Sequence, residues 1–383
     1  MTKNEIYMDW AATTPMHPGT ITAMTGYYND DYLNPSALYA ERSSGTLAHC
    51  RRQMAYALGE GVNEDEIFFT SGGTEANNII MRLTDVPLLN SWTVLSTPIE
   101  HASMIRSIEY ARWPAYKIHV DEHGFVDLEH LSTLLKKYSD RRSPIFVSVM
   151  AVNNELGTLQ NLSEIAHIVH EYPNTIFFSD WVQFFGHDRW SPPHYGVDMC
   201  SISAHKFGGP KGAGALYIKK DKQEYFDPIM LGGHQESGMR AGTENMGGII
   251  GMTYAAQKAA FDSTTNDAQE KMLLKRLREG LSEIPDIWFN SPDNTINILN
   301  VGFRGVMGTD LLVTLMGQGI YLSAGSACNS GQNTPSHVLS AIGLSDEDAS
   351  SCIRFSIGWN TTADEIDYVI KAVKVAVDML RGA

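Results

Sequence analysis

The chain of 383 residues is 43% hydrophobic and 19% charged, a composition typical of a globular protein large enough for more than one domain. Its formal net charge of −15 argues against nucleic acid or an anionic membrane as a direct partner. No apolar run approaches the ~20 residues of a membrane span and the N-terminus lacks a signal-peptide core, so we expect a cytoplasmic protein. The 4 cysteines lie far apart, which favours neither a disulfide framework nor a metal site.

The first part of the chain alternates between strand-like and helical patterns. A strand-like start at residues 6–14 breaks at Pro15, and helical periodicity follows over 17–30 and 37–58. Strand-like runs then recur at 66–70, 93–97, 116–120, 145–150, 175–179, 199–203 and 214–218. Because helical patterns separate many of these runs, we predict an α/β fold with a mostly parallel sheet and helices on both faces.

The last part of the chain has a different organisation. A helix is expected from Asn245 to about residue 262, where the polar stretch 262–267 is the best candidate for a linker. Beyond it, a smaller α+β unit is predicted from a charged helix, two strands and a final helix, at 268–283, 294–301, 318–323 and 363–381.

The most informative stretch is 199–212, an apolar strand that ends on Lys206 and breaks into a glycine-rich turn. Burial disfavours the ammonium form of a lysine, which suits a Schiff-base nucleophile because that role needs a neutral amine. The preceding strand ends on Asp180, with Gln183 shortly after it. Pyridoxal phosphate requires such a lysine for its aldehyde and a carboxylate beside its ring nitrogen. A surface lysine in a basic turn is the alternative for Lys206 alone.

The motif Ser-x-Ser-x-His-Lys-x-x-Gly-Pro-Lys-Gly over 201–212, with Asp-x-x-Gln at 180–183, resembles the cysteine desulfurase branch of the fold-type I pyridoxal phosphate enzymes. This branch is also called the class V aminotransferases, and the resemblance covers nearly the whole chain. It implies a large domain with a mostly parallel seven-stranded sheet flanked by helices, plus a smaller α+β domain. The expected boundaries are 16–262 for the large domain, and 1–15 with 263–383 for the small domain that carries the catalytic cysteine.

The turn Ser71–Thr74 follows a strand and opens a helix, so its backbone N–H groups suit a phosphate. The resemblance implies that the phosphate of the cofactor is bound there, and that a threonine from a second subunit completes the site. A homodimer is therefore expected. The phosphate-binding residues that the resemblance implies are Gly73, Thr74, Ser203, His205 and, from the other subunit, Thr243.

Four further residues are assigned roles: those of His101 and Asn154 are implied by the resemblance, and those of Gln183 and Arg354 by their positions in the chain. His101, which begins a helix after a strand, would stack on the cofactor ring and serve in proton transfer; a polar cap histidine is the alternative. Asn154 ends a strand, where a buried amide needs partners, and would contact the cofactor and the substrate. Gln183 would donate to the ring phenolate. Arg354 lies in an apolar strand and would bind the substrate carboxylate, with an internal salt bridge as the alternative.

Cys328 lies in a run of small polar residues that favours an accessible thiol. The combination of motifs predicts a cysteine desulfurase that converts L-cysteine to L-alanine and leaves the sulfur as a persulfide on Cys328. Lys206, His101 and Cys328 are the predicted catalytic residues. Sulfur-acceptor proteins for iron–sulfur cluster assembly or thiolation pathways are the expected partners, and the sequence does not name which.

Two other function classes stay open. A class V aminotransferase or decarboxylase would share Lys206 and Asp180 without needing Cys328, and a sulfur-relay protein would lack catalysis. Trp181 and Ser237 depart from the family pattern, and we expect Trp181 to make the wall behind the cofactor ring bulkier. The segment 323–334 resembles the long-loop group of desulfurases, and we expect residues 326–334 to move between the cofactor and an acceptor protein.

Overall fold

The computed structural model describes residues 5–83, 92–139, 143–187, 191–324 and 336–382. Its largest element is a seven-stranded sheet in the order β2-β8-β7-β6-β5-β3-β4. All neighbouring strands of this sheet are parallel except β8, which runs antiparallel to both of its neighbours. The strands are β2 (Ile67–Thr70), β3 (Thr93–Ser96), β4 (Ala115–Lys117), β5 (Ile145–Ser148), β6 (Thr175–Asp180), β7 (Met199–Ser203) and β8 (Gly214–Ile218).

Helices cover both faces of this sheet, and their apolar residues form two separate cores. One core includes side chains of α2 (Glu41–Leu58), α5 (Leu128–Ser139), α6 (Leu162–His170) and the first half of α7 (Met246–Leu281). The other includes side chains of α3 (Gly73–Ile80) and α4 (Ala102–Tyr110). Within β6, Phe177 belongs to the first core while Ile176 and Phe178 belong to the second, as the alternation of side chains along a strand requires. The predicted α/β fold is therefore confirmed.

A smaller α+β unit is built on a three-stranded antiparallel sheet in the order β12-β10-β9. Its core combines the second half of α7 with two other helices, and Met8 joins it from the N-terminus. The N-terminal β1 pairs in parallel with β11, and Asp9 bridges to Ser356. The elements are β1 (Ile6–Tyr7), β9 (Ile287–Phe289), β10 (Ile298–Phe303), α8 (Gly308–Met316), β11 (Ile320–Tyr321), α9 (His337–Ala341), α10 (Asp346–Ser350), β12 (Cys352–Ser356) and α11 (Ala363–Gly382). Of the elements not yet named, α1 (Pro18–Asp30) packs along α7.

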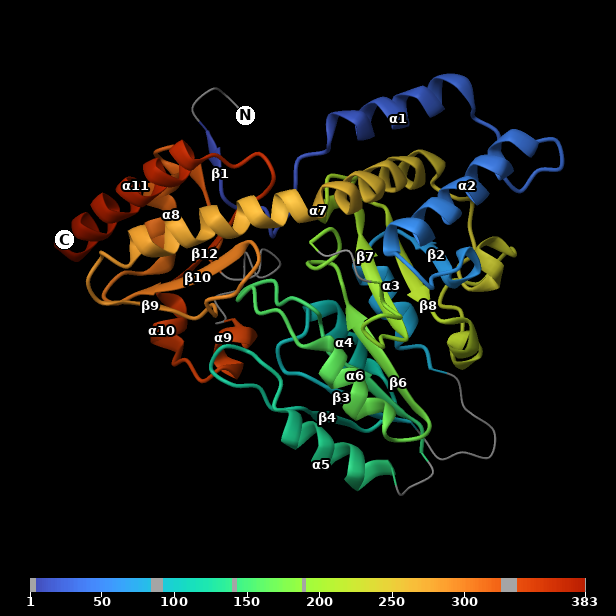
Figure 1. Ribbon diagram of the computed structural model, residues 1–383, viewed down its shortest axis with the longest axis horizontal. Helices are drawn as coiled ribbons and strands as arrows, with labels where there is room; N and C mark the ends of the chain where they lie inside the picture. The colour runs from blue at the N-terminus through green and yellow to red at the C-terminus, as the bar shows by residue number, and fades with distance from the viewer. Residues whose placement is uncertain (1–4, 84–91, 140–142, 188–190, 325–335, 383) are drawn as a thin grey trace.

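The predicted linker at 262–267 is wrong, because α7 continues through it as one helix of 36 residues. Figure 1 shows α7, in gold, running from the large sheet to the smaller unit. Ion pairs at i,i+4 spacing stabilise the polar stretch: Lys258 contacts Asp262 at 2.5 Å, and Lys271 contacts Asp267 at 2.7 Å. Such pairs offset the low helix propensity of serine, threonine and asparagine in this stretch. The division of the chain into two domains stays a proposal.

None of the helices in the described part of the chain has both the length and the apolar character that a membrane span requires.

Candidate active site

A cavity of about 200 Å³ lies at the carboxyl ends of β5, β6 and β7, where the first turns of α3 and α4 also meet. In an open parallel sheet, this edge is where ligands usually bind. Most of the residues predicted from the sequence line this one cavity. They are Gly73, Thr74, His101, Asn154, Asp180, Gln183, Ser203, His205, Lys206 and Arg354, together with Ala11, Ala12, Asn77, Met150 and Val182.

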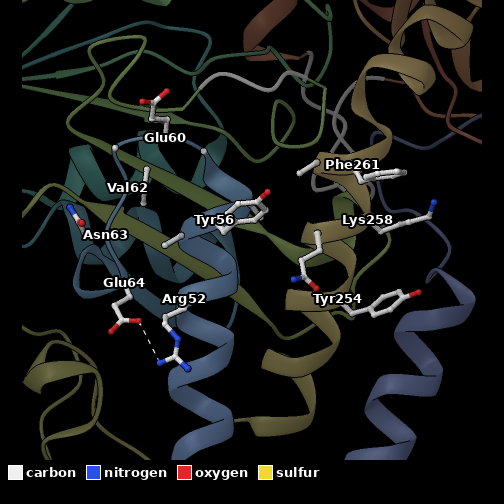
Figure 2. Close-up of a pocket in the computed structure, with 15 residues that line it drawn as sticks. Arg52, Tyr56, Glu60, Val62, Asn63, Glu64, Tyr254, Lys258 and Phe261 are labelled. Atoms are coloured by element: carbon white, nitrogen blue, oxygen red, sulfur yellow. Dashed lines mark ion pairs between the residues drawn. The ribbon is translucent and has the colours of Figure 1, made fainter.

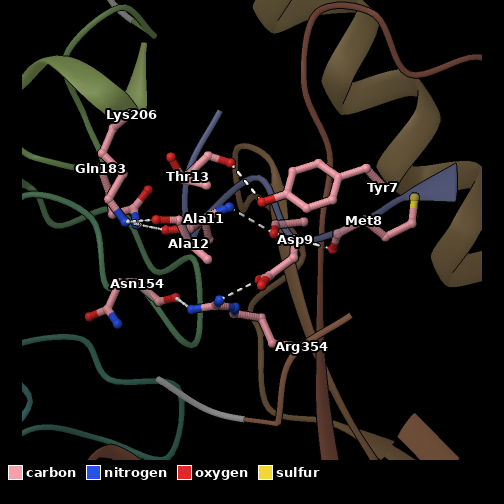
Figure 3. A network of polar contacts seen from close by, with 11 residues as sticks. Tyr7, Met8, Asp9, Ala11, Ala12, Thr13, Asn154, Gln183, Lys206 and Arg354 are labelled. Carbon is pink, nitrogen blue, oxygen red and sulfur yellow. Dashed lines mark hydrogen bonds and ion pairs between the residues drawn. The ribbon is translucent and has the colours of Figure 1, made fainter. Parts of the chain in front are cut away.

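Lys206 enters the cavity from the short 3-10 turn Ala204–Lys206 that follows β7. Its ammonium nitrogen donates to the carbonyl oxygens of Ala11 and Ala12, the second at 3.0 Å. The Gln183 amide donates to the same Ala11 oxygen at 2.7 Å. Figure 3 shows this N-terminal segment lying against both side chains. The segment therefore forms one wall of the cavity and holds the lysine in a defined orientation.

Asp180 ends β6 and is only 3% exposed. One carboxylate oxygen accepts from the Asn77 amide at 2.8 Å, and the other accepts from the Val182 backbone N–H at 2.9 Å. The Asn77 amide also donates to the Ser103 hydroxyl at 2.9 Å. The Asn77 side chain therefore holds the Asp180 carboxylate in place through this hydrogen bond. Sequence reasoning missed Asn77, although it lies one helical turn after the predicted phosphate turn.

His101 is the N-cap of α4, as the alternative interpretation of the sequence had it. Its Nδ1 accepts from the Ser103 backbone N–H at 3.1 Å, so the neutral ring carries its proton on Nε2. Burial lowers the pKa of His101, and Lys206 lowers it further, against an opposing effect of Asp180. A neutral imidazole with a defined tautomer therefore faces the cavity, and capping the helix is compatible with a role there.

The turn before α3 provides a cradle that only glycine fits. Gly72 has φ +152, and a Cβ on Gly73 would lie 2.6 Å from Val182 Cγ2. The first backbone N–H groups of α3 lack partners within the helix and attract an anion. Ser203 is buried beside this turn. An anion cradle, a buried carboxylate and a lysine amine in one cavity are the groups that pyridoxal phosphate requires, so the residues fit this cofactor.

His205 lies next to the lysine and contacts the N-terminal segment. Its Nδ1 is 3.1 Å from the Thr13 hydroxyl, and its backbone oxygen accepts from the Thr14 N–H at 2.9 Å. Burial and the charges of Lys206 and Lys211 lower the pKa of His205 to about 4. The imidazole is therefore neutral near pH 7.

Arg354 lies in β12 and is 1% exposed. Its Nη2 contacts the Asp9 carboxylate at 2.6 Å, and its Nη1 donates to the Asn154 backbone oxygen at 2.7 Å. Figure 3 shows the guanidinium between these two acceptors. The internal salt bridge that the sequence left as an alternative is therefore present, and the arginine nevertheless lines the cavity.

Two expectations about side chains near the cavity are wrong, namely the burial of Asn154 and the place of Trp181, while the contact of Asn154 with the cofactor and substrate stays a prediction. Asn154 is only half-buried, whereas the preceding Asn153 is fully buried and uses its amide to order the turn through bonds to Ile99, Glu155 and Leu156. Trp181 does not form a wall of the cavity. It packs into the large core against Phe184 and Tyr195, because a side chain that follows Asp180 points to the opposite side of the chain.

Among the described residues predicted for the site, Thr243 does not line this cavity. It is exposed on the segment before α7. Upstream in this segment, Glu236 forms a bidentate ion pair with Arg51 at 2.7 and 2.8 Å and accepts from the Phe69 N–H at 2.8 Å. Cys328 and the loop 326–334 lie outside the described residues. The cysteines that the structure describes, Cys50, Cys200 and Cys352, are all buried.

A larger surface groove of about 1110 Å³ lies between the end of α2, the turn after it and α7. Figure 2 shows Tyr56 and Tyr254 on its two sides, with the Arg52–Glu64 ion pair at one edge. None of the predicted site residues lines this groove. Among the described residues, no group of three or more histidine, cysteine or acidic side chains is arranged to hold a metal ion.

Comparison with known proteins gives consistent results. The protein-family model for Aminotransferase class-V matches residues 6–369. A curated relative, the cysteine desulfurase IscS of Dictyoglomus turgidum, is 36% identical over 99% of this chain and 96% of its own length. A solved NifS-like protein is 32% identical, with a TM-score of 0.88 over 98% of this chain and 100% of its own. The solved structure of SspA in complex with cysteine is 28% identical, with a TM-score of 0.78 over 93% of this chain and 100% of its own.

Proposed function

The chain belongs to the class-V aminotransferase family, and we propose that within this family it is a cysteine desulfurase, which removes the sulfur of L-cysteine and leaves L-alanine. One observation carries the proposal: Lys206, Asp180 and Arg354 line a single small cavity in a chain that resembles cysteine desulfurases over its whole length. A solved relative that binds cysteine supports the choice of substrate.

Pyridoxal phosphate, when bound, supplies an aldehyde for the lysine and a ring that withdraws electrons from the substrate. In the proposed site, Lys206 binds the aldehyde and Asp180 keeps the ring nitrogen protonated. Gln183 donates to the ring oxygen. The phosphate is held by Gly73, Thr74, Ser203, His205 and Thr243 of the partner subunit. The proposed active form is therefore a homodimer.

Substrate binding and proton transfer use residues on the other walls. The Arg354 guanidinium binds the carboxylate of L-cysteine, and Asn154 lies beside it. Lys206 would take the Cα proton, because its amine lines the same cavity as the Arg354 guanidinium. His101 holds a proton on Nε2 and serves as a proton donor. Its imidazole would also stack on the cofactor ring. Closure of the site by the N-terminal segment keeps water away from these groups.

Sulfur transfer is assigned to Cys328. Its thiolate attacks the substrate sulfur, so that a persulfide forms on the enzyme as the carbon–sulfur bond of the substrate breaks. The persulfide then passes to an acceptor protein of iron–sulfur assembly or of a thiolation pathway. We place the reaction in the cytoplasm, and we propose the domain boundaries given above, with Cys328 in the small domain.

The test is a pair of variants with one control. Lys206→Ala should lose the absorbance near ~420 nm expected of lysine-bound pyridoxal and should form no alanine. Cys328→Ser should keep that absorbance but carry no persulfide and release no sulfide. Lys211→Ala, an exposed lysine in the same glycine turn, should retain both. Transfer of the amino group to a keto acid without sulfide release would instead identify an aminotransferase.

A further inference from the structure

A second cavity, of about 250 Å³, adjoins the candidate active site on the other side of the catalytic lysine. The two cavities share Lys206 and Gln183 as walls. The second one lies where the middle of α7 meets the turn after β6 and the loops of the smaller unit. Its lining includes the aromatic side chains Trp10 and Trp359 and the polar side chains His187, Lys258, Glu270 and Asn297.

Two buried oxygen atoms in this lining have no hydrogen-bond donor among the described residues. They are Glu270 Oε2 and Asn297 Oδ1, and their side chains are 3% and 8% exposed. A buried polar atom without a partner costs on the order of the desolvation energy of that group, so native proteins rarely leave two of them in one cavity. With Glu270 ionised, the cavity therefore lacks donors, not acceptors.

The histidine beside these atoms does not supply the missing bonds. Asn297 Nδ2 lies 3.5 Å from His187 Nε2 and donates to the Ile357 oxygen at 3.2 Å, so this amide nitrogen is already engaged with other acceptors. With Nε2 as an acceptor, the neutral ring carries its proton on Nδ1. That nitrogen is 3.4 Å from Glu270 Oε2, which is longer than an ordinary hydrogen bond.

The nearby lysines are already engaged elsewhere, Lys206 with the backbone oxygens of Ala11 and Ala12 and the other two with acids. Lys258 contacts Asp262 at 2.5 Å, and Lys271 contacts Asp267 at 2.7 Å. Glu270 has no lysine or arginine partner among the described residues, although it is the most deeply buried of these acids. The cavity thus combines two unused acceptors, one uncompensated carboxyl group and aromatic walls.

We propose that this cavity binds a small primary ammonium group, either the free ammonium ion or the amino group of a small amino acid. An ammonium group brings several N–H donors and one positive charge, which satisfies Glu270 and Asn297 together. Aromatic faces such as those of Trp10 and Trp359 also attract cations. Among the described residues, no group of three or more histidine, cysteine or acidic side chains is arranged here to hold a metal ion. Half-buried Lys258, Asp262 and Asn266 mark the route of entry from solvent.

Titration behaviour supports this assignment. Burial, with the nearby charge of Asp267, raises the pKa of Glu270 to about 8, and burial lowers the pKa of His187 to about 4 although Asp267 opposes it. Both groups are therefore neutral near pH 7 when nothing else occupies the cavity. A bound ammonium group compensates the charge of an ionised Glu270, so it binds in exchange for the proton.

The experiment measures thermal unfolding of the cofactor-loaded enzyme at pH 8 in ammonium chloride and in sodium chloride at equal ionic strength. The midpoint should be higher in ammonium chloride, by about 2 °C or more at saturation, because a ligand that binds only the folded state stabilises it. Glu270→Gln should abolish this difference, since its amide supplies a donor and carries no charge. Glu279→Gln, at an exposed site on the same helix, should keep it.

An L-alanine series identifies the source of the ammonium group. A rise that wild type shows and Glu270→Gln lacks assigns the amino group of an amino acid, whereas a response to ammonium chloride alone assigns the free ion. Identical midpoints in ammonium and sodium chloride would overturn the proposal and leave water as the occupant. An ammonium response retained by Glu270→Gln would overturn it equally. Neither outcome depends on the proposed desulfurase activity, because the readout is stability.

Discussion

Replacing Gly73 with alanine tests whether the turn before α3 is a phosphate cradle shaped by close packing. The added Cβ would lie 2.6 Å from Val182 Cγ2, about 1 Å closer than an ordinary contact between carbon atoms. Val182 cannot yield freely, since its backbone N–H donates to the Asp180 carboxylate. The strain therefore reaches both the phosphate turn and the carboxylate assigned to the ring nitrogen.

The expected size of the effect follows from this overlap. Overpacking by one methyl group costs about 1–3 kcal/mol, and the better helix propensity of alanine returns about 1 kcal/mol of it. If about 1–2 kcal/mol of this cost opposes binding of the cofactor, the affinity for pyridoxal phosphate falls about 5- to 30-fold. We expect this loss in a fluorescence titration of the cofactor-free protein.

Gly45→Ala is the matched control. Gly45 lies in α2 with open space around its Cα, so the same substitution should stabilise the helix and leave the cofactor affinity unchanged. Wild-type affinity in Gly73→Ala would refute the close-packing argument. An equal loss in both variants would show that the effect is not specific to the cradle.

Three further substitutions test other parts of the structure. Asp9→Asn should raise KM for L-cysteine about tenfold with little change in cofactor absorbance, because the Arg354 guanidinium loses the carboxylate that orients it; an unchanged KM in steady-state assays would exclude this role. Asn77→Ala removes a donor from buried Asp180 and should lower stability by about 1–3 kcal/mol in urea unfolding, an effect that Asn78→Ala, on the exposed side of α3, should not reproduce. The raised pKa of Glu270, about 8 against 4.5, means that its contribution to stability is complete below pH 4.5 and is lost as the pH rises toward 8. Wild type should therefore lose stability relative to Glu270→Gln between pH 5 and 8, and parallel curves would contradict the shift.

The sequence predicted the large sheet well because each parallel strand is buried on both faces and reads as a short apolar run. The run 175–180 became β6 and the run 199–203 became β7, with Asp180 and Lys206 where the strands end. Neighbouring parallel strands bring their carboxyl ends to one edge, so the sequence also predicted that these two residues would meet.

Contacts between distant segments could not be predicted in this way. The carbonyl groups of Ala11 and Ala12 that hold Lys206 are backbone atoms, and no side-chain pattern marks them. Asn77 looks like any polar residue on a helix until the fold places it behind Asp180. The prediction of a linker at 262–267 was wrong for a related reason. Polar residues of this stretch form ion pairs along one continuous helix near a polar cavity.

The contacts of Arg354 leave room for both a structural and a functional role of this residue. A guanidinium has five N–H donors, with two on each terminal nitrogen and one on Nε. The contact with Asp9 uses Nη2 and the contact with Asn154 uses Nη1, so each terminal nitrogen keeps a second hydrogen. A carboxylate can therefore still bind end-on to both terminal nitrogens while Asp9 holds the plane of the guanidinium. The salt bridge that keeps the buried charge in place would then also orient it toward a substrate carboxylate.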